Sequence, residues 1–527
     1  MSGWNRNPWL LLLTALLLVG AGCGRSGLPA DASVLRVSQR NEPGDLDPAT
    51  ADLPDEFFII RALSEGLVTP DPDGGPPRPA AATHWEISAD GLRYTFHLRP
   101  GALWSNGEPV TAADFVASYD RVLNPQTAAP KARLFFLVQG AEDYLRGRTT
   151  DFSTVGFSAP DAHTLQITLA RPAPQFLAHV ASGPWIPVNP RVVRTHGRLW
   201  TLPENFVGNG PFRLREWAPN RHIVVVKRPD YWRADHVLLD AIRFLALDNG
   251  DAEERAFRAG QVDVTMAVPP TKIEGYAALD PTPLRQIPLH ETRFLSFNTQ
   301  HPPLDDVRVR RALAMALDRE SLVTNVLGGG QVPAYQFVPD GLGDFSSNER
   351  LRENPDEARQ LLAEAGYPGG RDFPVLELTG WSNTPVLEAV QAMWREKLGI
   401  RVRITVHDAK VHLAALQQGA YDIGFVTAIP DIADPADLLE SFLPAAPGNY
   451  PQWSDPTYDR LLTRASESTA NDERLRRLAE AEARLTAECP VAPLYFNTKN
   501  ILVQPWIYGW REDALWTRFY HDVAVDR

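Results

Sequence analysis

A β-hairpin is encoded by residues 85–98, which read WEISADGLRYTFHL. Trp85 and Ile87 alternate with polar residues, and a turn signal follows at residues 89–91. Beyond that turn, every second residue from Leu92 to Leu98 is apolar. Alternation on both sides of a Gly-containing turn is typical of two antiparallel strands that share one buried face. The segment therefore predicts a half-buried sheet.

A helix is predicted directly after this hairpin. Thr111 can cap it, and Asp114 follows three positions later, the spacing of a capping box. Phe115, Tyr119 and Val122 then recur at helical spacing and form an apolar stripe. A hairpin followed by an amphipathic helix indicates a sheet with a helix packed against it.

The rest of the chain alternates short strands with helices. One helix is opened by Asn354 and Pro355 and closed by Gly366, in the order cap, first-turn proline and C-terminal glycine. In the helix predicted over residues 307–318, we expect Arg308, Arg310 and Arg311 to be exposed. This succession indicates mixed α/β domains. Further predicted strands cover residues 35–38, 223–226, 242–247 and 400–406, and another helix covers residues 385–398.

Composition narrows the class of protein. A chain of 527 residues is too long for one core and predicts two or three domains. A formal net charge of -13 argues against a nucleic-acid partner. The chain has two cysteines, Cys23 and Cys489, so no disulfide is available if Cys23 carries a lipid.

The N-terminus has the layout of a secretory leader. Arg6 precedes the apolar run of residues 9–19, and the small residues 20–22 lead into Cys23. This arrangement resembles the bacterial lipobox, although Gly20 stands where that motif usually has Leu. We predict a signal peptide over residues 1–22, a lipid-modified Cys23 and a tether over residues 23–34. An ordinary cleaved signal peptide with an incidental cysteine is the competing interpretation.

Signatures of catalysis are missing from the sequence. It contains no Walker-type loop, no G-x-S-x-G elbow and no H-E-x-x-H pair. His407 and His412 are five apart and do not share a helix face, while Asp434 and Asp437 suit helix capping better than an acid–base pair. We therefore predict no catalytic residues, no metal site and no cofactor.

A series of motifs, in a fixed order along the chain, carries a family resemblance. The motifs are Glu65-Gly66-Leu67-Val68, Asp71-Pro72-Asp73-Gly74, Trp104-Ser105-Asn106-Gly107, Gly208-Asn209-Gly210-Pro211-Phe212, Arg228-Pro229-Asp230-Tyr231-Trp232, Phe297-Asn298 and Pro505-Trp506. In these motifs the mature chain resembles the extracellular family 5 solute-binding proteins, the oligopeptide- and dipeptide-binding components of ABC transporters, and it is most similar to the oligopeptide binders.

The resemblance implies a periplasmic-binding-protein-like α/β clamshell of class II, with three lobes and a hinge of two crossover strands. Ligand is enclosed when the lobes close. The implied lobe I comprises residues 35–64, 191–292 and 499–527, lobe II residues 65–190, and lobe III residues 293–498.

The resemblance also implies a binding site for an extended peptide. Asp431 falls on the acid that holds the peptide α-amino group, and Thr427 and Ile429 fall where backbone contacts occur. Four more residues are expected near the cleft: Leu53, Phe135, Met266 and Asn497. The implied protein is a periplasmic or extracytoplasmic lipoprotein, a monomer that delivers peptides to an ABC permease and performs no covalent chemistry.

Three departures from the oligopeptide binders leave the ligand open. Ala428 replaces a Trp, and Leu416 and Phe425 replace two Arg. The same fold could instead bind a modified or cell-wall-derived peptide, an opine, haem, a nickel chelate or an oligosaccharide. Two hypotheses from different functional classes stay open as well: an envelope hydrolase, and a scaffold or chaperone that holds unfolded segments.

Overall fold

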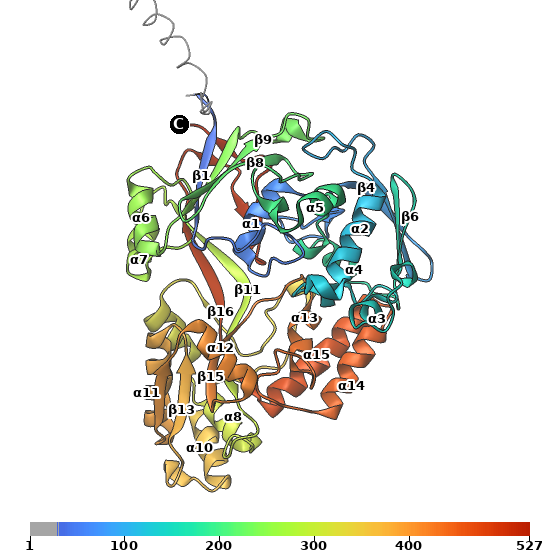
Figure 1. The fold of residues 1–527 in the computed structure, drawn as a ribbon. Coiled ribbons are helices and arrows are strands. Elements are labelled where there is room, and N and C mark those ends of the chain that lie inside the picture. The colour runs from blue at the N-terminus through green and yellow to red at the C-terminus, as the bar shows by residue number, and fades with distance from the viewer. Residues whose placement is uncertain (1–28, 30) are drawn as a thin grey trace, which may run out of the picture.

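Two bodies joined by a pair of long strands make up the molecule (Figure 1). The computed structural model describes residues 29 and 31–527. The predicted signal peptide and Cys23 lie outside the described residues. Lobes I and II, named by the residue ranges given above, form the upper body in Figure 1, and lobe III forms the lower one. The lobe boundaries stay predictions.

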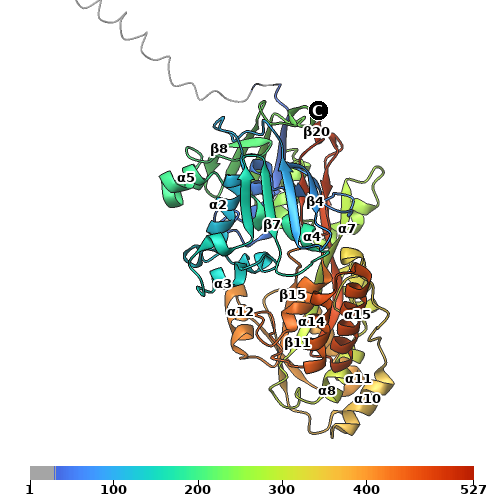
Figure 2. The ribbon, with the colours of Figure 1, turned by 90° about the vertical axis from the view of Figure 1, so that its right-hand side faces the viewer.

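The predicted hairpin is confirmed in the sheet of lobe II. Strands β4 (Ala82–Ile87) and β5 (Arg93–Leu98) are antiparallel, with Trp85 opposite Phe96. The sheet order is β4-β5-β7-β6, with β6 at Phe157–Asp161 and β7 at Thr164–Thr168. Helix α2 (Ala112–Leu123) lies beside it (Figure 2), and the Asp114 carboxylate accepts a bond of 2.9 Å from the N–H of Thr111. Shorter elements are β2 (Val68–Thr69), β3 (Arg78–Pro79), α3 (Ala141–Leu145) and α4 (Phe176–Val180).

Lobe I contains a four-stranded sheet of order β1-β10-β9-β8. Strand β1 is parallel to β10, and the other pairs are antiparallel. Val37 from the first segment of lobe I, Phe244 from the second and Val503 from the third pack in one buried core. The elements are β1 (Val34–Gln39), α1 (Pro54–Leu63), α5 (Pro190–His196), β8 (Phe212–Ala218), β9 (His222–Lys227), β10 (Ala241–Ala246), α6 (Gly250–Arg258), α7 (Pro270–Ala277), β17 (Ile507–Tyr508), β18 (Arg511–Glu512), β19 (Arg518–Phe519) and β20 (Ala524–Val525).

Lobe III is a six-stranded mixed sheet of order β12-β16-β11-β15-β13-β14, with helices on both faces. Phe294 and Leu295, adjacent on β11, enter different cores because neighbouring strand residues point to opposite faces. The elements are β11 (Leu284–Phe297), α8 (Val307–Met315), α9 (Arg319–Ser321), β12 (Val332–Pro333), α10 (Pro355–Glu364), β13 (Leu376–Gly380), α11 (Thr384–Leu398), β14 (Val402–Val406), α12 (Ala409–Gln418), β15 (Ile423–Ala428), α13 (Pro435–Leu439), α14 (Pro456–Glu467), α15 (Asn471–Glu488) and β16 (Val491–Leu502).

One expectation for lobe III is wrong. Arg310 was expected to be exposed on helix α8, but its side chain is buried. Its guanidinium donates to the carbonyls of Leu304, Asp305, Glu488 and Cys489. The carbonyls that end α15 need donors, and Arg310 supplies them.

Strands β11 and β16 connect the two bodies. They pair antiparallel from Leu284 opposite Leu502, in the upper body, to Ser296 opposite Val491 in the lower one. The register shifts between Pro288 and Thr292, where the pair passes between the lobes. Over residues 29 and 31–527, no helix combines the length and the apolar character needed to cross a membrane.

Candidate ligand-binding cleft

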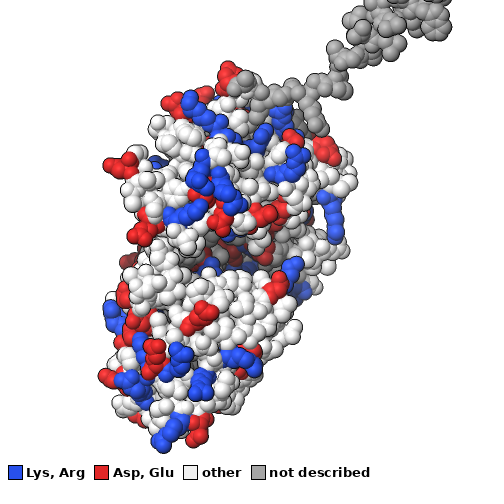
Figure 3. Space-filling model, turned by 90° about the vertical axis from the view of Figure 1, so that its left-hand side faces the viewer, with Lys and Arg blue, Asp and Glu red and all other residues white. Residues whose placement is uncertain are grey.

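A cavity of about 590 Å³ lies between the two bodies, with walls from all three lobes. Figure 3 shows the molecule hollowed at this level, with acidic and basic side chains gathered in the hollow. The volume falls within the range of about 300–1,000 Å³ typical of small-ligand sites. The cavity is therefore the candidate site.

A cluster of charges closes one side of the cavity. Asp431, in the loop that follows β15 of lobe III, contacts two cations of lobe II. Its carboxylate oxygens lie 2.8 Å from Lys131 Nζ and 2.6 Å from Arg133 Nη2. Arg133 Nη1 also lies 2.8 Å from the Asp437 carboxylate. Lobes II and III are thus joined by ion pairs at the cavity wall.

Carboxylates outnumber cations in this cluster. Burial raises the pKa of Asp437, although Arg133 acts in the opposite direction. Burial alone would lower the pKa of Arg133, but Asp437 and Asp431 outweigh it and the net direction is upward. Asp52 adds a further carboxylate 3.8 Å from Lys131 Nζ. The cluster thus has three carboxylates and two cations, and one more cation would make their numbers equal.

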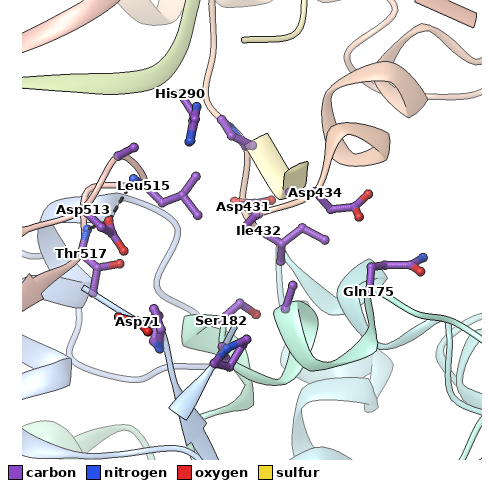
Figure 4. A pocket seen from close by; sticks show the side chains of 18 of the residues that line it. Asp71, Gln175, Ser182, His290, Asp431, Ile432, Asp434, Asp513, Leu515 and Thr517 are labelled. Carbon is purple, nitrogen blue, oxygen red and sulfur yellow. Dashed lines mark hydrogen bonds between the residues drawn. The ribbon is translucent and has the colours of Figure 1, made fainter. Parts of the chain in front are cut away.

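The opposite side of the cavity is formed by the hinge strand β11 and the C-terminal segment of lobe I. In Figure 4, Asp513, Leu515 and Thr517 lie across the cavity from Asp431, and His290 lies above them. The Asp513 carboxylate accepts bonds from the N–H groups of Leu515 at 2.9 Å and Thr517 at 2.7 Å. Burial raises the pKa of Asp513 and lowers that of His290, so it favours the uncharged form of both side chains.

The comparisons with known proteins agree with this geometry. The family described as bacterial extracellular solute-binding proteins, family 5, middle region, matches residues 76–450. The chain belongs to family 5. Members of this family are binding proteins and not enzymes.

Relatives and solved structures share nearly the whole length of this family 5 protein. The periplasmic murein peptide-binding protein MppA of Escherichia coli is 33% identical over 91% of each chain. The E. coli protein YgiS, named a probable deoxycholate-binding periplasmic protein, is 32% identical over 95% of each chain. The solved structure of the E. coli murein tripeptide-binding protein MppA has a TM-score of 0.84 at 31% identity, covering 94% of this chain and 99% of its own. The predicted family and clamshell fold are confirmed.

Two of the predicted site residues line the cavity of this family 5 protein: Asp431 and Ile429. Ile429 is 40% exposed, a large apolar side chain available for contact. Leu53 is 49% exposed and immediately precedes Pro54, which lines the cavity. Thr427 is on β15, opposite Arg293, and its hydroxyl oxygen is buried with no hydrogen-bond partner among the residues that the structure describes.

Phe135, Met266 and Asn497 do not line the cavity. The ring of Phe135 is fully buried in the lobe II core, stacked 4.1 Å from Trp185, and the preceding Leu134 lines the cavity, so a place for Phe135 near the cleft stays a prediction. Met266 is buried in lobe I, where its N–H donates to Glu253. Asn497 Nδ2 donates over 3.0 Å to Glu291 on the hinge.

The sequence did not point to the cations of the cleft. Lys131 and Arg133 lie just before an apolar stretch, and this arrangement is the sole local sequence feature that could have pointed to them. Their partner Asp431 is about 300 positions away, so proximity is set by the tertiary fold. Leu416 and Phe425, at the two positions where the resemblance implies Arg in the oligopeptide binders, are buried in lobe III cores.

Histidines gather elsewhere in the described part of the chain. His412 Nε2 lies 2.9 Å from the carbonyl of Phe425, in keeping with a structural role. His84, Glu86 and His97 share one face of the lobe II hairpin, with possible ligand atoms within 4.8 Å of one another. They are not among the residues that line the cavity.

Proposed function

We propose that this family 5 protein is a lipid-anchored extracytoplasmic binding protein that captures oligopeptides and delivers them to an ABC permease. Family membership supports a binding role, and several relatives are named as peptide-binding proteins. The observation that carries the proposal is the cavity of about 590 Å³ between lobes, with the Asp431 cluster in its wall.

In this proposal the ligand α-amino group joins the Asp431 cluster. The cluster holds three carboxylates against two cations, so an ammonium group is the missing charge. A buried ammonium without an opposite charge is strongly unfavourable. Thr427 and Ile429 then supply contacts to an extended peptide backbone, which is satisfied best by pairing with a strand.

Ligand capture is coupled to closure in this proposal. A ligand that contacts lobes II and III together binds the closed form more tightly and shifts the population toward it. The cavity walls come from both bodies, and β11 and β16 are the continuous connections that a hinge requires. The closed, loaded form is the one we expect the permease to recognise.

Calorimetry with a pool of random tri- to pentapeptides tests the proposal. Mass spectrometry of what co-purifies identifies the retained molecules. We expect saturable binding and peptides among the retained ligands. Retention of non-peptide solutes alone, with no heat from the pool, would overturn the peptide assignment.

A cell-wall-derived peptide is the second candidate ligand. MppA, named as a murein peptide-binding protein, is 33% identical over 91% of this chain. The replacements that the resemblance implies at Leu416, Phe425 and Ala428 support a site that differs from that of the oligopeptide binders. Calorimetry with a murein tripeptide separates the two candidate ligands. Tighter binding of the murein tripeptide than of the random peptide pool favours the cell-wall-derived peptide. Deoxycholate serves as a non-peptide arm, because YgiS carries that name.

The proposed anchor is Cys23 with its two acyl chains. Two chains give stable membrane attachment where one is marginal. Cys23→Ser should release the protein into the soluble fraction, as measured by fractionation of cells. Continued membrane retention of this variant would refute the lipid anchor while leaving the binding function in place.

A further inference from the structure

Arg61 lies where two cavities meet. Its side chain, on helix α1, lines the cavity of about 590 Å³ and also a second cavity of about 440 Å³. Pro70 and Thr517 line both as well, so the two spaces adjoin at this point. The position gives Arg61 access to a ligand in either space.

Arg61 differs from the other Lys and Arg residues that line the two cavities. In the described part of the chain, each of those residues has a carboxylate within 4.0 Å, but Arg61 has none. The paired residues are Arg78, Lys131, Arg233, Arg511 and Arg518. Within the residues that the structure describes, Arg61 is therefore the cation lining these cavities that forms no ion pair.

The hydrogen-bonding capacity of Arg61 is also mostly unused. A guanidinium has five N–H donors. Over the described residues, the side chain of Arg61 makes one hydrogen bond, from Nη2 to the carbonyl of Ala181 at 3.0 Å. Asp513 is close enough to influence Arg61 electrostatically, but its carboxylate accepts from the backbone of Leu515 and Thr517. Burial lowers the pKa of Arg61 to about 10, so it remains charged at pH 7.

We propose that Arg61 binds a carboxylate of the ligand through paired N–H···O bonds. A guanidinium fork matches a carboxylate, and such charge-assisted pairs are the strong ones in a desolvated site. The inference rests on the proposed function and deepens it, because the Asp431 cluster then binds the ammonium end and Arg61 a carboxylate. The ligand class becomes a zwitterionic peptide with a free carboxylate, at its C-terminus or on a side chain.

Three probes test this assignment: trialanine, trialanine amide and the amide of Ala-Ala-Glu, whose carboxylate is on a side chain. Binding is measured by calorimetry with wild type and Arg61→Met. We expect wild type to bind trialanine at least about tenfold more tightly than its amide. Arg61→Met should remove that preference. A preference of wild type for the Glu-containing amide over trialanine amide, lost in Arg61→Met, would assign the side-chain carboxylate as the partner.

Two further variants make the result specific. Arg61→Lys keeps the charge without the fork and should retain part of the preference; it replaces Arg61→Met in the comparison if that variant does not fold. Arg146→Met removes an exposed lobe II cation, which pairs with Glu142, and should leave all three affinities unchanged.

The outcomes separate the two proposals. If wild type bound trialanine, the Ala-Ala-Glu amide and trialanine amide with equal affinity, the role of Arg61 would be overturned and peptide binding would be left intact. An equal loss on all probes in a folded Arg61 variant would overturn it too. A wild type that binds none of the probes and no peptide pool would overturn the proposed function and, with it, this inference.

Discussion

Two networks of charged side chains differ in what they connect. In lobe I, Glu512 contacts Lys499 and Arg518, and the side chains of all three are at most 3% exposed. Burial would raise the pKa of Glu512, but the two cations outweigh it and the net direction is downward. The ring of Phe58 lies 3.9 Å from the Arg518 guanidinium. This network is dry and lies within one lobe.

The network around Asp431 lies between lobes. The side chain of Asp431 is 21% exposed and that of Arg133 is 48% exposed, so water reaches the ion pairs. Lys131 comes from lobe II and Asp431 from lobe III, so opening the cleft separates them. The difference indicates that buried charge fixes the architecture of lobe I, while hydrated charge at the cleft can exchange partners.

The largest expected effect comes from removing the central charge of the lobe I network. Glu512→Gln leaves Lys499 and Arg518 buried without a counter-charge, and we expect a loss of about 3–5 kcal/mol in the free energy of unfolding. Urea denaturation measures it. Asp143→Asn, at an exposed pair with Arg148, is the matched control and should cost less than about 1 kcal/mol. Equal costs for the two variants would remove the distinction between the networks.

At the cleft, the expected effect is on binding. Asp431→Asn removes a charge proposed to hold the ligand ammonium, so affinity for trialanine should fall about tenfold to a hundredfold. Affinity for N-acetylated trialanine should change far less, because that probe carries no ammonium. Calorimetry with both probes measures the difference. Unchanged affinity of the variant for the free-amine probe would contradict the role of Asp431.

A buried acid that forms no ion pair within the described residues adds a third environment to the comparison. Glu482 on α15 is fully buried, and its carboxylate accepts bonds from the N–H groups of Phe337 at 2.6 Å and Val338 at 3.3 Å. Burial raises its pKa to about 7, although these two bonds act in the opposite direction. In the unfolded chain the pKa of Glu is about 4.3.

The sign of the pH dependence follows from these pKa values. The stabilising contribution of Glu482 is complete below the unfolded pKa and is lost as pH rises to about 7. Its share of the loss is at most about 1.4 kcal/mol per pH unit. Glu482→Gln should flatten the curve between pH 5 and 7, as measured by urea denaturation at each pH. Parallel curves for wild type and variant would show that Glu482 does not titrate in this range.

Local signals predicted the elements but not the cleft. The Trp85–Leu98 hairpin, the Thr111 capping box and the Asn354 cap depend on residues within a few positions of one another, and the structure has all three. The family resemblance predicted that Asp431 belongs to the ligand site, and in the structure Asp431 lines the cavity. The exposure expected of Arg310 was wrong because its burial depends on a segment distant in sequence, the end of α15.

The smallest expected effect separates binding from stability at the same cluster. Lys131→Met removes one cross-lobe ion pair, and Arg133 still contacts Asp431, so unfolding should change by no more than about 1 kcal/mol. Without Lys131 the unliganded protein should open more readily, which small-angle scattering detects as a larger radius of gyration. In Lys131→Met the Asp431 cluster has lost one ammonium group, and the ligand ammonium can take its position. Trialanine should therefore gain affinity relative to its N-acetylated form, and a reduced ratio would mean that Lys131 does not compete with the ligand for Asp431.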